Sequence, residues 1–175
     1  QRAEGVDGPP MPPSGSTGGP VDWVAGTAMV VRRRVWETVG PFDESYRFYC
    51  QDADLCFKAR RAGWGVAIVP GFRVLHQHGG TIASQEGAVG SVHPELIWTD
   101  VLRMTGKLWG SESERRTFLA LRFGGNLRLL GRRVAATIVP PQDPASWRAA
   151  DAAYADALRG LDRAHRTCEN RAAQR

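Results

Sequence analysis

The chain has 175 residues, 42% of them hydrophobic, which is enough for one domain with a buried core. Its formal net charge is +5, and arginine supplies nearly all of the excess. A basic balance fits acidic partners such as nucleic acid, anionic lipid or phosphorylated substrates, and it equally fits a solvated, arginine-rich surface.

Three cysteines occur, at Cys50, Cys56 and Cys168, without a Cys-x-x-Cys spacing. This pattern argues against a disulfide scaffold and against a cysteine zinc site, and it is compatible with a reducing compartment. No apolar run approaches the roughly 18–20 residues of a membrane span, and no signal-peptide pattern is present. The chain does not begin with Met, so we expect a fragment.

The first half is expected to mix strands and helices. Residues 1–20 are rich in Gly, Pro, Ser and Thr and predict a flexible loop or linker. Periodicity and turn residues then predict a buried strand at 21–31 broken at Gly26-Thr27, a short helix at 35–39, a helix at 52–62, and strands at 66–69 and 72–76.

The second half is expected to be helical. One helix is predicted at about 94–109, a second at about 113–130, and a final Ala/Arg/Asp-rich helix at about 144–168, after a rigid Pro-rich break. A few strands, a helix between them and a helical tail predict an α/β fold with a helical extension.

Asp52 and Asp54 lie two apart at the expected start of a helix. The positive end of the helix dipole favours their carboxylate forms, but residues i and i+2 do not share a helix face. At most one of them is therefore expected to point into a given site. The alternative is that both only cap the helix, which is ordinary for Asp in a first turn.

His76 and His78 would share one face if the strand at 72–76 continued, a spacing that metals can use. A lone histidine at a strand end is usually a polar surface residue or a histidine with its hydrogen bonds satisfied inside the protein. Hard carboxylate oxygens with imidazole suit Mn²⁺ or Mg²⁺. One alternative function is therefore a metal-dependent hydrolase that uses Asp52, Asp54, His76, His78 and His93.

Aromatic residues surround the acidic turn in the sequence. Tyr46 and Tyr49 lie beside it and are candidates for contact with the apolar face of a sugar ring, whereas Trp23 and Phe42 are expected in the core.

Several pieces of residues 21–81 follow one another in a characteristic order: DWVAGTAMVVRR (22–33), VGPFDE (39–44), YCQDADLC (49–56), RRAGW (60–64), VP (69–70) and VLH (74–76). In this order they resemble the second half of glycosyltransferase family 2, especially its rhamnosyltransferase-like bacterial members. The ordered series is much more specific than any single piece.

The resemblance implies a GT-A fold, in which a Rossmann-like nucleotide-binding half precedes an acceptor-binding half, and displacement at the anomeric carbon with inversion. It implies that Asp52 is the catalytic base and that Asp54 supports the helix start. His76 matches a histidine that in some members ligates the divalent metal, Mn²⁺ or Mg²⁺, holding the donor diphosphate. Gly26 and Thr27 match small residues under the donor sugar.

Two departures from the family pattern stand out. Gln51 occupies the position of a family acid, so this catalytic position can form hydrogen bonds but carries no charge. The Asp-x-Asp motif of the family's nucleotide-binding half is missing, since Asp52-Ala53-Asp54 lies in the acceptor-half motif. We therefore expect a chain truncated at its N-terminus that is inactive as a transferase by itself.

The expected organisation is a flexible segment at 1–20, the acceptor-side half of a GT-A domain at 21–92, a helical region at 93–139 and a C-terminal helix at 140–175. The expected partners are a nucleotide-sugar donor, a glycan or polyprenyl-linked acceptor and an anionic membrane surface, but not nucleic acid. The expected role is cell-wall or surface-polysaccharide synthesis, in the cytoplasm or peripherally at the inner face of the plasma membrane.

A second alternative is a non-catalytic basic module for nucleic acid or anionic membrane. Its support is a row of arginines on the second long helix: Arg115, Arg116, Arg122, Arg128, Arg132 and Arg133.

Overall fold

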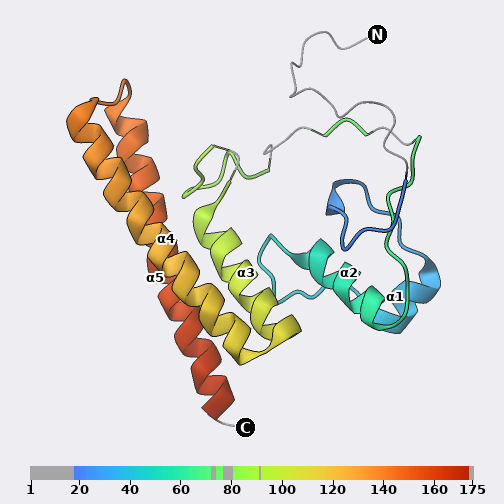
Figure 1. The fold of residues 1–175 in the computed structure, drawn as a ribbon. Helices are drawn as coiled ribbons and strands as arrows, with labels where there is room; N and C mark the ends of the chain where they lie inside the picture. Colours follow the sequence, from blue (N-terminus) through green and yellow to red (C-terminus); the bar gives the residue numbers. More distant parts are fainter. Residues whose placement is uncertain (1–17, 72–73, 77–80, 91, 174–175) are drawn as a thin grey trace, which may run out of the picture.

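The computed structural model describes residues 18–71, 74–76, 81–90 and 92–173. Figure 1 shows a bundle of three long helices beside a smaller region built from short helices and extended segments. The elements in chain order are a 3₁₀ turn η1 (Gly26–Ala28), α1 (Arg33–Val39), α2 (Gln51–Arg61), α3 (Pro94–Trp109), α4 (Ser111–Ile138) and α5 (Pro144–Ala173).

The long helices begin and end at residues suited to helix termini. His93 caps α3 and its ring Nδ1 accepts from the backbone N–H of Leu96 at 3.4 Å, while Pro94 occupies the first helical position. Gly110, with φ of 87°, ends α3 and leads directly into α4. At the start of α5 the Asp143 side chain accepts from the backbone N–H of Ala145 at 3.0 Å.

The core of the bundle contains one large side chain from each long helix. Leu102 of α3, Phe118 of α4 and Leu161 of α5 pack together, with Trp98 of α3 against them. The ring of Phe118 also stacks on His165 of α5, with 3.9 Å between the ring centroids. The three-helix unit is therefore held mainly by apolar burial between its own helices.

In the smaller region, two backbone hydrogen bonds join the segment around Pro20 to the segment around Ala67. Val21 N–H donates to the Val66 carbonyl at 2.9 Å, and Ile68 N–H donates to the Gly19 carbonyl at 3.1 Å. These bonds surround a single antiparallel bridge between Pro20 and Ala67.

The prediction of strands was wrong for the described residues. Among the described residues, 21–31 form η1 and extended segments, 66–69 form one bridge, and 74–76 form no strand, while 72 and 73 lie outside the described residues. A strand must pair its N–H and C=O groups with a neighbouring strand, and a sheet of only two strands has marginal stability. The described part is thus mainly helical, and the expected α/β sheet is not formed in it.

The predicted helices are confirmed. The helix expected at 94–109 matches α3, and the one expected at 52–62 begins and ends one residue earlier, as α2. Helix α4 extends eight residues beyond the expected 130, to Ile138. None of the described helices combines the length and apolar character that a bilayer span requires.

Two aromatic residues expected in the core are not buried. Trp23 is half-exposed, and Phe42 is exposed while its ring packs edge-on against Trp36 at 5.5 Å between centroids. Both lie in the smaller region, where packing partners are few among the described residues.

Candidate functional site

The acidic turn lies at the start of α2, after a strained backbone position. Cys50 precedes the helix with φ of 71°, the one non-glycine residue with positive φ in the described part of the chain. Non-glycine residues in this region are uncommon and occur where surrounding contacts hold them. Gln51 is the first residue of α2, and Asp52 and Asp54 follow in its first turn.

Asp52 joins the start of α2 to the turn η1. Its Oδ2 accepts from the backbone N–H of Gly26 at 2.7 Å, and its Oδ1 accepts from the N–H of Ala53 at 2.8 Å. The side chain is half-buried and forms no ion pair with a described residue. The carboxylate is therefore positioned by two amides, close to the positive end of the helix, without a cation from the described part of the chain to neutralise it.

Asp54 has a different environment from Asp52. Its side chain is 1% exposed. Its carboxylate lies 2.7 Å from the Lys58 ammonium and 3.2 Å from that of Lys107 on α3, and it accepts from the Tyr46 hydroxyl at 3.1 Å. Buried charge requires such compensation. Asp54 thus cross-links α2, α3 and the preceding loop, and the structure gives it a supporting position.

Tyr46 belongs to the same buried cluster. Its side chain is 4% exposed. Burial, followed by the charge of Asp54, raises the pKa of its hydroxyl far above the usual range. Tyr46 therefore remains a neutral donor to Asp54, and in this conformation it does not face solvent where a sugar could contact it.

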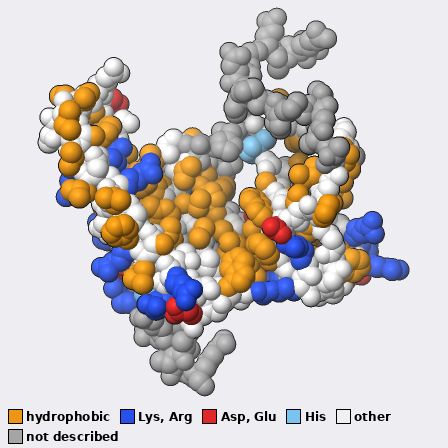
Figure 2. All heavy atoms as spheres, viewed as in Figure 1, with side chains coloured by type: hydrophobic (Ala, Val, Ile, Leu, Met, Phe, Trp, Pro, Cys, Tyr) orange, Lys and Arg blue, Asp and Glu red, His pale blue; other side chains and the backbone are white. Residues whose placement is uncertain are grey.

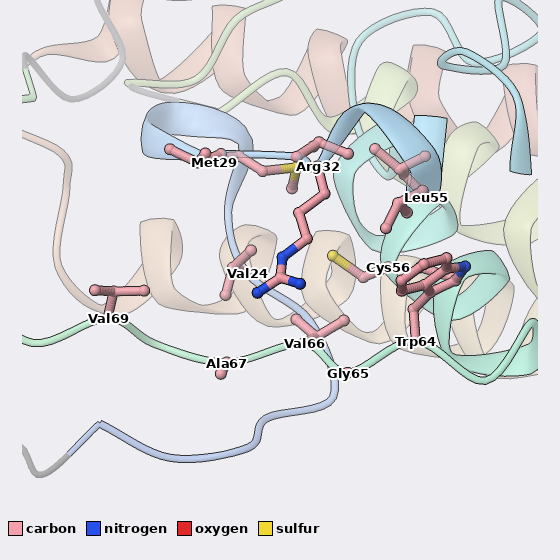
Figure 3. A pocket seen from close by; sticks show the side chains of 14 residues that line it. Val24, Met29, Arg32, Leu55, Cys56, Trp64, Gly65, Val66, Ala67 and Val69 are labelled. Atoms are coloured by element: carbon pink, nitrogen blue, oxygen red, sulfur yellow. The ribbon is translucent and has the colours of Figure 1, made fainter. Parts of the chain in front are cut away.

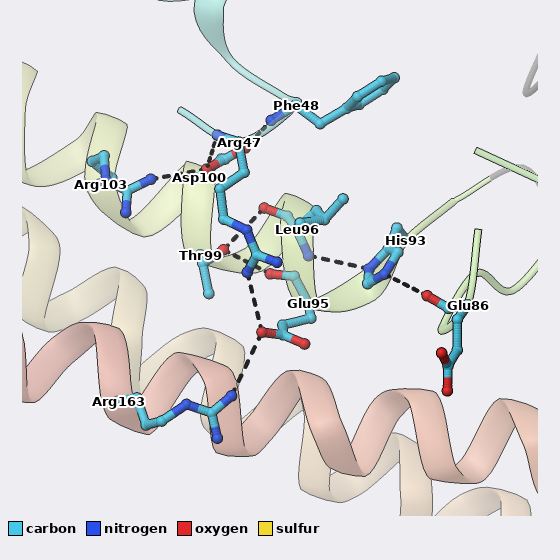
Figure 4. Close-up of polar contacts among 10 residues, drawn as sticks. All are labelled: Arg47, Phe48, Glu86, His93, Glu95, Leu96, Thr99, Asp100, Arg103 and Arg163. Atoms are coloured by element: carbon cyan, nitrogen blue, oxygen red, sulfur yellow. Dashed lines mark hydrogen bonds and ion pairs between the residues drawn. The ribbon is translucent and has the colours of Figure 1, made fainter. Parts of the chain in front are cut away.

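Asp100 of α3 holds the loop that leads into α2 (Figure 4). Its fully buried carboxylate accepts from the backbone N–H groups of Arg47 at 3.0 Å, Phe48 at 2.9 Å and Tyr49 at 2.9 Å. Arg103 also donates to it at 3.0 Å. Three consecutive amides converge on one carboxylate, so α3 fixes the path of the chain immediately before Cys50.

Tyr49 reaches the start of α3 from the other side of this loop. Its hydroxyl accepts from the backbone N–H of His93 at 3.2 Å, and its ring packs edge-on against Phe48 at 5.0 Å between centroids. The His93 ring is itself engaged, with Nε2 lying 3.0 Å from the Glu86 carbonyl oxygen and Nδ1 bound to Leu96 (Figure 4). Tyr49 is half-buried, so part of its side chain remains accessible.

An apolar cavity of about 440 Å³ lies beside α2. Its walls are the extended segments that flank η1 and the segment that follows α2 (Figure 3). Val35 of α1 and Leu55, Cys56 and Ala59 of α2 complete the lining. Arg32 is the one charged residue in its lining. Cavities of this size and polarity are large enough to receive several side chains or a small ligand.

The described residues do not form a metal centre. No group of three or more His, Cys, Asp or Glu side chains among them is arranged to hold an ion. His76 is exposed at the end of the extended segment 74–76, and His78 lies outside the described residues. Since Asp54 and His93 are bound within the protein, the described geometry does not support the metal-dependent hydrolase.

The structure brings together some of the predicted site residues. Gly26 and Asp52 are hydrogen-bonded across 26 positions in the sequence, and Thr27 lies next to Gly26 in η1, with its side chain exposed. Gln51 is half-buried beside them.

Sequence reasoning missed Asp100 and Lys107. Both lie on the face of α3 that meets the acidic turn, together with Arg103, at the helical spacings i, i+3 and i+7. A row of charges on one face of an otherwise apolar helix was the available signal. It predicts a polar face but not the segment that packs on it.

Comparisons with known proteins agree with the resemblance. Residues 9–88 match the family model described as "Glycosyltransferase like family 2". Over 57 residues, 33% of this chain and 19% of the relative, the chain is 44% identical to an N-acetylglucosaminyl-diphospho-decaprenol L-rhamnosyltransferase of Mycobacterium tuberculosis. Over 56 residues, 32% of this chain and 21% of the relative, it is 43% identical to rhamnosyltransferase WbbL of Escherichia coli.

These matches cover a limited part of each relative. The chain spans about a fifth of the length of the curated relatives that it matches. No solved structure matches the chain significantly.

Proposed function

We propose that this chain, which carries a glycosyltransferase family 2 segment at residues 9–88, forms the acceptor side of an inverting sugar transferase. The donor is a nucleotide sugar, and the acceptor is a hydroxyl of a glycan or of a polyprenyl-linked sugar. The decaprenol named for one relative supports a lipid-linked acceptor. The pathway is cell-wall or surface-polysaccharide synthesis.

The observation that carries this proposal is the environment of Asp52. Asp54, two residues along, is buried against two lysines, whereas Asp52 is half-buried, is held by the Gly26 amide and has no cation partner in the described residues. A general base needs a positioned carboxylate that a substrate proton can reach. Of the two acids in the turn, Asp52 meets this requirement.

In the proposed reaction, the acceptor hydroxyl oxygen attacks the anomeric carbon of the donor sugar from the face opposite the phosphate. The new carbon–oxygen bond forms while the bond to the phosphate oxygen breaks, and the nucleoside diphosphate leaves with that electron pair. Asp52 accepts the hydroxyl proton. Inversion follows because attack and departure occur on opposite faces of one carbon.

Neighbouring residues complete the proposed site. Gln51 can donate a hydrogen bond to a sugar hydroxyl, and the partly accessible ring of Tyr49 can pack on the apolar face of a sugar. Gly26 and Thr27 lie beside Asp52, where the donor sugar would be bound. Family 2 members often use Mn²⁺ or Mg²⁺, but the described residues do not assemble a site for it, so no step here depends on a metal.

The donor-binding half is proposed to cover the apolar cavity beside α2. Val30, Ile68 and Val69 are exposed around this region, and their backbone has few partners among the described residues. An extended segment with exposed apolar side chains and free backbone groups can pair with a strand of another segment. The small share of each relative that the chain spans is consistent with such a half being part of the whole transferase.

The test is a transferase assay on the gene product that contains this chain, with nucleotide sugars and a polyprenyl-linked acceptor. Asp52→Asn keeps the size of the side chain and an oxygen for the Gly26 amide, but it cannot accept the proton. Loss of a general base is expected to lower kcat by about 10²–10⁴-fold. Glu44→Gln, at an exposed acid near the turn, is the matched control and is expected to keep kcat.

Two results would overturn parts of this proposal. Undiminished kcat in Asp52→Asn would remove Asp52 as the base. Robust turnover by the 175-residue chain alone would contradict the expectation that the donor-binding half lies elsewhere.

A further inference from the structure

The outward face of α4 carries a continuous apolar stripe. Its residues recur every three or four positions and are all exposed, with Phe123 72% and Ile138 74% exposed. We call these residues the α4 stripe: Leu119, Phe123, Leu127, Leu130, Val134 and Ile138. Figure 2 shows hydrophobic side chains gathered along this helix with Lys and Arg side chains around them.

The stripe lies on the opposite side of α4 from the bundle core. Glu114, Phe118 and Gly125 are the buried residues of α4, and they face α3 and α5. At 1.5 Å per residue the stripe extends for about 28 Å along the helix axis. Single exposed apolar residues are ordinary, but a contiguous apolar strip of this length indicates an interaction surface.

The charge around the stripe has one sign. Residues 115–142 contain six arginines and no acidic residue. Arg122 and Arg132 form ion pairs with Asp162 and Asp151 of α5, on the inner side. Arg115 and Arg116 share the single carboxylate of Glu112, and Arg133 forms no ion pair with a described residue.

We propose that the α4 stripe binds the surface of an anionic lipid bilayer, with α4 lying in the plane of the interface. An apolar face inserted among the lipid tails, bordered by arginines at the headgroups, is the pattern of interfacial amphipathic helices. This proposal rests on the proposed function, because the lipid-linked acceptor is part of that function. It would place the acceptor side of the site at the membrane where such an acceptor resides.

Charge distinguishes this occupant from a second copy of the chain. In a two-fold dimer the same patch faces itself, so the stripe of one copy would pack on the stripe of the other. Arg115, Arg116 and Arg133 would then approach arginines of the partner copy, and residues 115–142 offer no carboxylate to neutralise them. Anionic headgroups supply the missing charge.

The test is sedimentation of the chain with vesicles of phosphatidylcholine alone or of phosphatidylcholine mixed with phosphatidylglycerol. The triple variant Phe123→Ser/Leu127→Ser/Leu130→Ser removes the centre of the stripe, and Arg116→Gln/Arg133→Gln removes two bordering charges. Leu75→Ser, at a 91% exposed residue away from α4, is the matched apolar control, and Arg159→Gln on α5 is the matched charge control. Circular dichroism and light scattering report the fold and the oligomeric state of each variant.

Binding is expected with the mixed vesicles, with a loss of more than tenfold in affinity for the triple serine variant. Each removed arginine is expected to weaken binding by about fivefold, and both controls are expected to bind like the unaltered chain. Absence of binding to mixed vesicles, or equal binding by a folded triple serine variant, would overturn the proposal. The proposal would also be overturned if the unaltered chain formed a dimer and did not bind vesicles, while the triple serine variant was a monomer.

The outcome is separable from that of the proposed function. Transfer by the gene product to a short water-soluble acceptor does not need a membrane. If vesicle binding fails while transfer to that acceptor is intact, only the membrane-binding proposal is wrong. If the chain binds vesicles but the gene product transfers no sugar, only the transferase proposal is wrong.

Discussion

The carboxylate of Asp100 in α3 accepts a hydrogen bond from the backbone N–H of Phe48 over 2.9 Å, in the loop that leads to the acidic turn. The neighbouring amides of Arg47 and Tyr49 donate to the same carboxylate. The helical bundle therefore sets the position of the chain from which α2, and with it Asp52, begins. Distant bundle residues should affect the site through this link.

Replacing Asp100 with Ala is expected to destabilise the protein by about 3 kcal/mol. The change leaves several backbone amides without their acceptor and leaves Arg103 without its carboxylate. Urea unfolding followed by circular dichroism measures the effect. Asp100→Asn keeps one acceptor oxygen, so its free energy of unfolding should fall less than that of Asp100→Ala.

The matched control for this experiment is Asp156→Asn on α5, where the carboxylate is exposed and pairs with Arg159. Exposed pairs contribute little, so its free energy of unfolding should change by less than about 1 kcal/mol. Equal stability of Asp100→Ala and the unaltered chain would contradict a structural role for the carboxylate.

Asp43 should make the stability of the fold depend on pH in the acid range. The hydrogen bond from Lys107 holds the pKa of Asp43 well below its usual range, and the backbone N–H of Ser45 adds to this effect. The carboxylate therefore stays ionised in the folded protein, while in the unfolded chain it takes up a proton near pH 4. Its contribution is present above that pH and is lost as the pH falls further.

Asp43→Asn removes this titration. The variant should be less stable than the unaltered chain at pH 7, and the difference should shrink between pH 5 and pH 3. Unfolding curves in urea at several pH values measure the slope. A constant difference over that interval would show that Asp43 does not titrate differently in the two states.

The thiols near the acidic turn should react slowly in the folded protein. Burial, with added repulsion from Asp100 and Asp52, raises the pKa of Cys50 to about 12, and burial raises the pKa of Cys56. At pH 8 a thiol with such a pKa has roughly a thousandfold less thiolate than an ordinary cysteine. In a Cys168→Ser background, iodoacetamide should label both residues rapidly only after urea is added. Rapid labelling of the folded chain would mean that the turn opens readily.

Helix prediction succeeded where local signals agree with packing. Pro94 and Gly110 determine the bounds of α3 through the conformations that they favour, and both are visible in the sequence. The second long helix was expected to end at about residue 130, yet α4 continues through Gly131 to Ile138 because it packs along α5. These contacts override the cost of one glycine in the helix.

The strands could not be predicted because a strand is defined by its partner. Residues 66–69 have the composition of a buried strand, but the described chain provides only the segment around Pro20 to pair with them. For a similar reason, only part of the site could be predicted. Asp52 and Gly26 occur in ordered motifs, whereas the role of Asp100 depends on which loop reaches α3, and helical periodicity does not contain that information.

Two adjacent glycines of α4 should respond in opposite directions to the same substitution. A Cβ at Gly125 would lie 2.8 Å from the Trp98 ring and 2.9 Å from the Leu158 side chain, whereas a Cβ at Gly124 would meet no atom within 4 Å. Overpacking a helix contact typically costs about 1–3 kcal/mol, so Gly125→Ala should destabilise the bundle. Gly124→Ala should stabilise it by up to about 1 kcal/mol, because alanine favours the helix more than glycine does. Thermal and urea unfolding of both variants measure the difference, and stabilisation by Gly125→Ala would show that α4 does not approach α3 and α5 this closely.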